Sequence, residues 1–385
     1  MSERLQGEEL VALIERVFQP RATDTGIAVL VDLPDAAVAD HPCWQARREM
    51  AAGWVEELAG QGASCPLPVS LWLYPNVRTN NGDLPVGAWR HGGGPLPASA
   101  DELDPAAAVP FAELFRGWSI LLAPTEFSAT APLKVAARSF PIRAATMPGF
   151  TAEMIPALRL DYGEVNRRVA RLAGLLTAAE GCDLLFHHPQ GDSALHLDLR
   201  HRSAHASGGL VPEPGFAGNL PSGEAYIVPY EGERAGEPSR TAGFLPVQFG
   251  DEVVVYRIQG NRALEVLPGG AAAAAEAAHL RREPAYGNLA ELGLGVLAAF
   301  GVEPVGEILL DEKLGLHIAF GRSDHFGGTV GPARFSAPGE VIHIDRVYVP
   351  ACQPRIRVAA ADLLLPAGER LALMRDQAYV EGLFD

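Results

Sequence analysis

The C-terminal half of the sequence carries acidic and imidazole side chains inside otherwise apolar segments. Five of them could do chemistry together: Glu224, Glu291, His317, His343 and Asp345. Burying an unpaired charge is costly, so each group needs a polar neighbour, an arginine or a metal ion. Three carboxylates and two imidazoles are the oxygen and nitrogen ligands that suit Zn, Co or Mn.

The pair His343 and Asp345 lies in the expected strand 342–349. Side chains alternate along a strand, so this pair shares one face while Ile342 and Ile344 share the other. Taken alone, the pair is also compatible with an ion pair, and a single histidine with a hydrogen-bonded core residue. Two ions about 3.5–4 Å apart need a bridging carboxylate, which three acids can provide. The set therefore indicates one or two divalent ions.

Six segments carry a family resemblance. They are RAATMPGFT (143–151), GCDL (181–184), NLPSGE (219–224), NLAELG (288–293), DEKLGLHIAFG (311–321) and IHID (342–345). In order and spacing they resemble the thermophilic-type metallo-aminopeptidases, which are aminopeptidase T and a related staphylococcal enzyme (peptidase family M29). The resemblance covers most of residues 140–350, and the N-terminal third matches in its general α/β character.

The resemblance implies a fold and a chemistry. The fold is an α/β N-terminal domain with a mostly parallel sheet and a β-rich C-terminal domain with the metal site in the cleft, often as a homodimer. The chemistry is cleavage of the N-terminal amide of a small peptide or amino-acid-like substrate, with water activated by two Zn, Co or Mn ions. The implied metal ligands are Glu224, Glu291, His317, His343 and Asp345. We expect Glu224 or Asp345 to bridge the ions and regard Glu291 as the weaker candidate for proton acceptor.

One position departs from the family. Seven residues after the first ligand histidine the family has a tyrosine near the metals, whereas this sequence has Asp324, followed by His325. Imidazole titrates near neutral pH and a phenol does not. We hypothesise that His325 or Asp324 supplies the polarising or proton-transferring group. The alternative is that this loop contacts a different substrate.

The chain also resembles a second group of enzymes, which have a different chemistry. Mononuclear Fe(II) dioxygenases that open 2,5-dihydroxypyridine rings share the segment ATMPG (145–149) and the His-x-Asp strand. Their metal ligands do not include the two-glutamate set, so Glu224 and Glu291 favour the hydrolase. A third possibility is a binding or scaffold protein without turnover.

The other motifs of the sequence give weaker indications of function. The sequence lacks HExxH, Walker A and GxSxG patterns. GLGVLA (293–298) matches a dinucleotide pattern by letter but follows no β-branched strand, and HGGG (91–94) indicates a flexible loop. A second histidine group surrounds the expected strand 195–202: His187, His188, His196, His201 and His205. Arg202 or Arg322 could anchor a substrate carboxylate.

Composition narrows the class of protein. The net charge of −16 among 385 residues, with only two lysines, Lys134 and Lys313, argues against nucleic-acid and membrane-surface partners. The N-terminal residues form an amphipathic helical stripe rather than a signal peptide, and no apolar run is long enough to span a membrane. The four cysteines form no C-x-x-C pair. We therefore expect a cytoplasmic protein.

The elements predict two domains, 1–180 and 181–385. The first alternates strands and helices, which is typical of a parallel sheet, with a surface loop at 85–105. The second is β-rich, with a hairpin over 252–266 that turns at Gly260 and Asn261. Expected strands are 27–32, 69–74, 120–123, 142–147, 226–229, 307–310, 316–320, 342–349 and 356–359. Expected helices are 44–60, 111–116, 131–139, 162–180 and 271–281.

Overall fold

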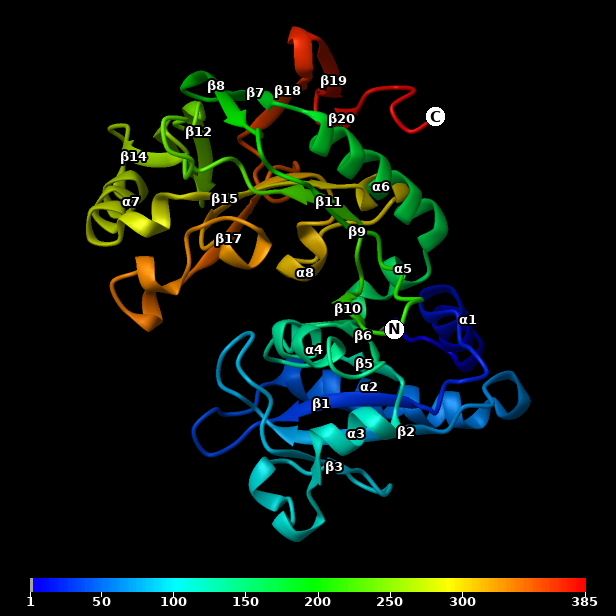
Figure 1. Cartoon of the computed structure of the whole chain (residues 1–385). Helices are drawn as coiled ribbons and strands as arrows, with labels where there is room; N and C mark the ends of the chain where they lie inside the picture. The colour runs from blue at the N-terminus through cyan, green and yellow to red at the C-terminus, as the bar shows by residue number, and fades with distance from the viewer. Residues whose placement is uncertain (1–2) are drawn as a thin grey trace. The chain divides into compact units, whose positions relative to one another are not determined.

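The computed structural model describes residues 3–385, which form two compact units (Figure 1). The first unit takes in the chain up to Asn166 together with Gly209–Ser222, and the second takes in Arg167–Gly208 and Gly223–Asp385. This division differs from a single boundary at residue 180 in two places. The break falls inside helix α6 (Tyr162–Ala178), and a later segment returns to add a strand to the first sheet.

The first unit is built on one sheet in the order β10-β6-β5-β1-β2-β3-β4. Its parallel strands are β1 (Ile27–Leu33), β2 (Val69–Pro75), β5 (Ile120–Ala123), β6 (Arg143–Thr146) and β10 (Phe216–Asn219). Strands β3 (Gly87–Arg90) and β4 (Val109–Pro110) are antiparallel additions. Every residue of β1 is buried, as expected for a parallel strand covered on both faces.

Five α-helices lie wholly within the described part of the first unit: α1 (Gly7–Phe18), α2 (Pro42–Gly60), α3 (Phe111–Gly117), α4 (Thr130–Ala137) and α5 (Ile155–Leu158). Side chains of α3 and α4, such as Leu114 and Leu133, share one core cluster with Ala28 and Leu30 of β1. These two helices therefore cover the face of the sheet on which Ala28 and Leu30 lie. The βαβ alternation predicted from the sequence is confirmed.

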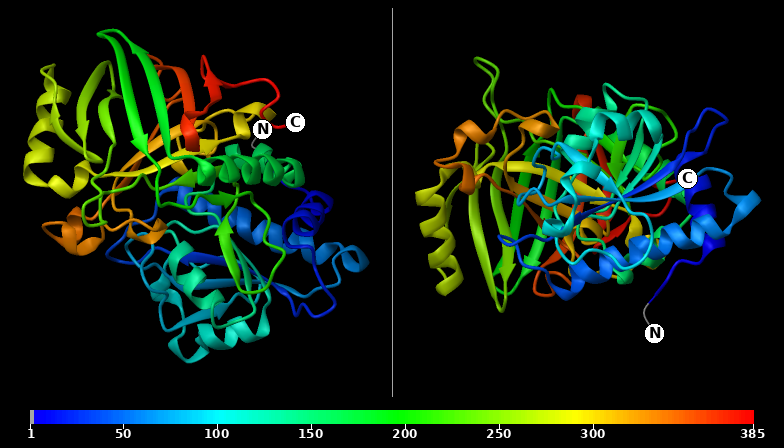
Figure 2. Two further views of the ribbon diagram at one scale, coloured as in Figure 1. Left: turned by 45° about the horizontal axis from the view of Figure 1, so that its top comes forward. Right: turned by 90° about the horizontal axis from the view of Figure 1, so that it is seen from below.

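The second unit contains two antiparallel sheets. The five-stranded sheet runs β17-β16-β15-β11-β9 and the eight-stranded one β14-β13-β12-β8-β7-β18-β19-β20. Figure 2 shows the ribbon from two further sides. The first has strands β9 (His205–Ser207), β11 (Glu224–Ile227), β15 (Leu289–Gly295), β16 (Leu316–Gly321) and β17 (His343–Val347). The second has β7 (Gly181–His188), β8 (Gly191–Asp198), β12 (Ala242–Phe249), β13 (Glu252–Gln259), β14 (Arg262–Val266), β18 (Arg357–Leu364), β19 (Arg370–Arg375) and β20 (Ala378–Tyr379).

The predicted hairpin is confirmed by strands β13 and β14, whose turn places Gly260 and Asn261 at positive φ. Helix α7 (Ala271–Arg282) is also confirmed. The predicted strand 307–310 is wrong, because this stretch forms the short helix α8 (Ile308–Asp311). The Asp311 carboxylate accepts hydrogen bonds from the N–H groups of Val305 and Gly306, which closes a local turn instead of a ladder.

The expected surface loop 85–105 is also wrong in part, since Gly87–Arg90 forms strand β3 and pairs with β2. Within residues 3–385, no helix has both the length and the apolar character needed to cross a lipid bilayer.

Candidate metal centre

The five predicted ligands come from four neighbouring strands of the five-stranded sheet. Glu224 begins β11, Glu291 lies in β15, His317 in β16, and His343 and Asp345 in β17. Residues opposite each other in a ladder share a face. The pairings Glu224–Gly295, Gly293–His317, Glu291–Ala319, Ala319–Asp345 and Gly321–His343 therefore put all five side chains on one face. Glycine and alanine take up the positions between them, which leaves this face open for the polar groups.

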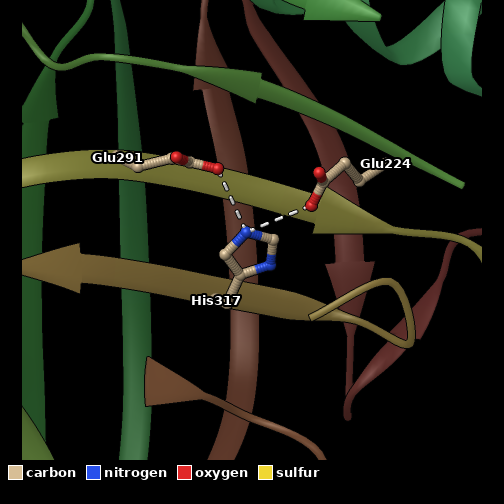
Figure 3. Close-up of side chains that lie close together, drawn as sticks. All are labelled: Glu224, Glu291 and His317. Carbon is tan, nitrogen blue, oxygen red and sulfur yellow. Dashed lines mark hydrogen bonds and ion pairs between the residues drawn. The ribbon is translucent and has the colours of Figure 1, made fainter. Parts of the chain in front are cut away.

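The polar atoms meet at short distances. Nε2 of His317 lies 3.2 Å from Oε1 of Glu291 and 3.4 Å from Oε2 of Glu224 (Figure 3). Nε2 of His343 lies 3.5 Å from Oε2 of Glu291 and 3.6 Å from Oδ1 of Asp345. The five residues thus form two groups of three, each with ligand atoms within 4.8 Å of one another, and Glu291 belongs to both. Glu291, rather than Glu224 or Asp345, turns one oxygen toward each group.

Both imidazoles are oriented by backbone carbonyls. Nδ1 of His343 donates to the carbonyl of Arg322 at 2.8 Å, and Nδ1 of His317 lies 3.4 Å from the carbonyl of Gly315. A carbonyl only accepts, so Nδ1 carries a proton and Nε2 is the ring atom that faces the carboxylates, where it holds either a second proton or a metal ion. This arrangement is the usual one for histidines that bind a metal through Nε2.

The electrostatics of the centre call for a cation. Burial favours the neutral ring, yet the hydrogen bond to Glu291 and the charge of Glu224 raise the pKa of His317 to about 9. Despite burial, the carboxylates of Asp345 and Glu291 likewise raise the pKa of His343. Burial opposes ionisation of Glu291, but hydrogen bonds from both histidines hold its pKa below the usual range. Ionised carboxylates therefore face ring nitrogens that bind either a proton or, in its place, a metal ion.

Two buried oxygen atoms support a metal ion. Oε2 of Glu224 and Oδ1 of Asp345 are buried and have no hydrogen-bond donor within residues 3–385. Leaving such acceptors unsatisfied costs free energy. The two oxygen atoms belong to different groups of ligands. Carboxylate and imidazole ligands suit Zn, Mn or Co. The residues present therefore fit the binding of a divalent metal ion.

The segment 293–298, which matches a dinucleotide-binding pattern by letter, has two glycines for structural reasons. A Cβ on Gly293 would lie 1.9 Å from Nε2 of His317, so the imidazole occupies the space that a side chain would fill. A Cβ on Gly295 would lie 2.2 Å from the backbone carbon of Lys313. The Gly-x-Gly pattern in β15 thus makes room for a ligand and for a neighbouring chain segment.

Sequence reasoning missed Lys313 and Glu312. The Lys313 side chain is 1% exposed, its Nζ lies 2.6 Å from Oε1 of Glu224, and it also pairs with Glu312. Burial raises the pKa of Glu312 to about 8, and burial also raises that of Glu224, against the opposing charge of Lys313. The rarity of lysine in the sequence was the available signal.

The loop after β16 carries Asp324 and His325 beside the second group. The ring of His325 lies 5.3 Å from that of His343, edge to face. Burial and the positive neighbours lower the pKa of His325 to about 4, so the ring is neutral near pH 7. Oδ1 of Asp324 accepts from Nε of Arg322 at 2.6 Å, which leaves it paired rather than free for proton transfer.

A glutamate with a largely buried side chain holds this loop in place. Glu231 accepts from the hydroxyl of Ser323 at 2.5 Å, from the N–H of Thr329 at 2.5 Å and from the amide of Asn288 at 3.0 Å. Neither the loop anchor nor its partners were signalled by the sequence pattern. The position of His325 over the sheet therefore depends on Glu231.

The remaining candidates do not converge on the centre. The second histidine group is dispersed, with separate acidic partners for His187, His196 and His201. The expected strand 195–202 is wrong in its second half because β8 ends at Asp198. Both candidate carboxylate anchors are already paired: Arg202 with Glu233 at 2.5 Å and Arg322 with Asp324.

Comparison with known proteins shows which solved structures have a similar fold. No protein-family model matches the chain, and no curated protein matches it. It is similar to the structure of 2,5-dihydroxypyridine dioxygenase from Pseudomonas putida KT2440, with 16% identity, a TM-score of 0.60 and 98% of each chain covered. It is also similar to AmpT from Thermus thermophilus, with 15% identity, a TM-score of 0.54, and 97% of this chain and 98% of that one covered. At these identities the likeness concerns the fold. This chain shares a mixed α/β fold with AmpT along nearly its whole length, as the sequence resemblance implied.

Proposed function

We propose that the protein is a metal-dependent hydrolase that cleaves the N-terminal amide bond of a small peptide or amino-acid-like substrate. The observation that carries the proposal is the division of the five ligands into two groups that share Glu291. A carboxylate with one oxygen in each group can bridge the two ions of a dinuclear site. The fold shared with AmpT supports the same assignment.

Each side chain has a role in this proposal. Glu224 and His317 would hold one ion, His343 and Asp345 would hold the other, and Glu291 would contribute an oxygen to each. Two divalent ions at these positions would lower the pKa of a shared water toward neutrality and polarise the scissile carbonyl. Because both oxygens of Glu291 are committed, His325 is the better candidate for relaying a proton, since its ring lies 5.3 Å from that of His343 and belongs to neither ligand group.

A second function is supported by one observation. The TM-score to the 2,5-dihydroxypyridine dioxygenase exceeds that to AmpT. In this alternative a single Fe(II) ion would support ring opening with dioxygen. The separation of the ligands into two groups of three favours the dinuclear hydrolase.

Metal analysis with paired assays separates the two functions. We expect two equivalents of Zn, Mn or Co per chain and release of the N-terminal residue from dipeptides and aminoacyl amides. One equivalent of iron, with oxygen uptake on 2,5-dihydroxypyridine and no amide cleavage, would establish the alternative. Protein that takes up none of these metals would be a relative without turnover.

Replacing His325 by alanine tests the proton-transfer role. We expect turnover to fall roughly 10²–10⁴-fold, the range for a lost general acid or base, with the metal content unchanged because His325 belongs to neither ligand group. His201→Ala is the matched control, since that ring pairs with Glu237 instead. Unaltered turnover in His325→Ala would end this assignment.

A further inference from the structure

Lys313 is a fully buried cation beside one of the two ligand groups. Its Nζ lies 2.6 Å from Oε1 of Glu224, and it also pairs with Glu312. The other oxygen of Glu224, Oε2, is the one that lies 3.4 Å from Nε2 of His317 and lacks a donor. The two oxygens of Glu224 therefore have different surroundings: one meets an ammonium group and the other faces the centre.

The composition of the chain marks this lysine as a specific choice. Only two of the 31 basic residues are lysines, and the other one, Lys134, is exposed on α4. The remaining basic residues are all arginines. An ammonium group is compact, whereas a guanidinium is a wide planar fork with five donors. A buried position between two carboxylates fits the smaller cation.

The backbone keeps Lys313 in this position. Gly295 lies opposite Glu224 in the ladder, and a Cβ on Gly295 would lie 2.2 Å from the backbone carbon of Lys313. The carbonyl of Lys313 accepts from the N–H of Leu297 at 2.9 Å. Close approach at a glycine and a backbone hydrogen bond thus fix the segment from which the ammonium reaches Glu224.

The two groups are unequal as a result. The group of Glu224, Glu291 and His317 has a fixed positive charge in contact with one ligand. The acids of the other group, Glu291 and Asp345, have histidines and no lysine or arginine within 4.0 Å among residues 3–385. A like charge close to a divalent ion weakens its binding.

We propose that Lys313 holds Glu224 to metal binding through one oxygen and makes the His317 side the weaker of the two ion sites. This inference rests on the proposed function. With Oε1 engaged by the ammonium, that side offers three protein ligand atoms, from Glu224, Glu291 and His317. Three protein ligands with one open position is the pattern of catalytic rather than structural sites. Lys313 is therefore a positioning residue that keeps a place for water or substrate.

Cobalt titration of chelator-treated protein tests the inference. In the unaltered protein we expect two equivalents of Co²⁺ by calorimetry, the second weaker than the first. Lys313→Met removes the charge and frees Oε1, so the weaker equivalent should bind roughly tenfold tighter or more. The visible Co²⁺ spectrum should change toward higher coordination while turnover falls. Lys313→Gln, whose amide can still donate to the carboxylates, should shift affinity in the same direction by less.

The outcomes are distinguishable. A lysine that serves only the fold would loosen metal binding when replaced, so weaker or unchanged binding in the variants overturns the inference. Lys134→Met is the control and should leave both equivalents as they are. If Lys313→Met fails to fold, Lys313→Gln decides, and two equal affinities in the unaltered protein contradict the inference without any variant. Absence of Co²⁺ binding in the unaltered protein would instead remove the proposed function.

Discussion

Glu291→Gln is expected to abolish binding of both metal ions, whereas Glu224→Gln and Asp345→Asn should each abolish one. Glu291 has one oxygen 3.2 Å from Nε2 of His317 and the other 3.5 Å from Nε2 of His343, so its charge serves both groups. Losing both ions removes the activation of water. Turnover should therefore fall by more than the roughly 10²–10³-fold that one transition-state contact is worth. Metal content per chain, measured after gel filtration, gives the result.

Glu265→Gln is the matched control, because that glutamate is exposed and pairs with Arg257 on the other sheet. It should keep full metal content and turnover. A Glu291→Gln protein that retains one tightly bound ion would show that Glu291 does not bridge. Glu224 or Asp345 would then be the residue that bridges the two ions.

Gly293→Ala should empty the His317 side of the centre through one added methyl group. The new Cβ would lie 1.9 Å from Nε2 of His317, whose ring is completely buried. Either the ring leaves its position between Glu224 and Glu291 or the strands separate. Overpacking of this kind costs about 1–3 kcal/mol of unfolding free energy. We expect that loss in denaturant unfolding, together with the loss of one metal equivalent.

The control for this change is Gly174→Ala. Gly174 lies exposed within α6, and a Cβ there would meet nothing within 4 Å. Alanine is the better helix former, so this variant should gain about 0.5–1 kcal/mol and keep its metal. Unchanged metal affinity in Gly293→Ala would mean that the position of the His317 ring is unimportant for binding.

Local patterns were sufficient to predict most elements of the fold. The β-branched run 120–123 coincides with β5, and Gly260-Asn261 marked the turn of a hairpin. The failures come from interactions that local patterns do not contain. The apolar stretch at 307–310 is helical because Asp311 satisfies preceding N–H groups. Strand β10 joins a sheet whose other strands lie more than 70 residues earlier, since Phe216 pairs with Arg143.

The site was predictable to a similar degree. Strand alternation alone placed His343 and Asp345 on one face. The meeting of Glu224, Glu291 and His317 depends on ladder register between strands that are distant in sequence, which single-sequence reasoning cannot supply. The central position of Glu291, which belongs to both groups, was not indicated by the sequence for the same reason. Lys313 was visible as a rare residue type, but its partner was not.

The ligands of the proposed centre are mounted on adjacent strands, each tied to the next by backbone hydrogen bonds. Such a frame exists before any ion arrives, unlike small metal domains, in which ion binding and folding are one event. Stripping the metal should therefore leave a folded apoprotein that can be reloaded. Which metal ion the site binds would then depend on which ions are available to a binding site that is already formed.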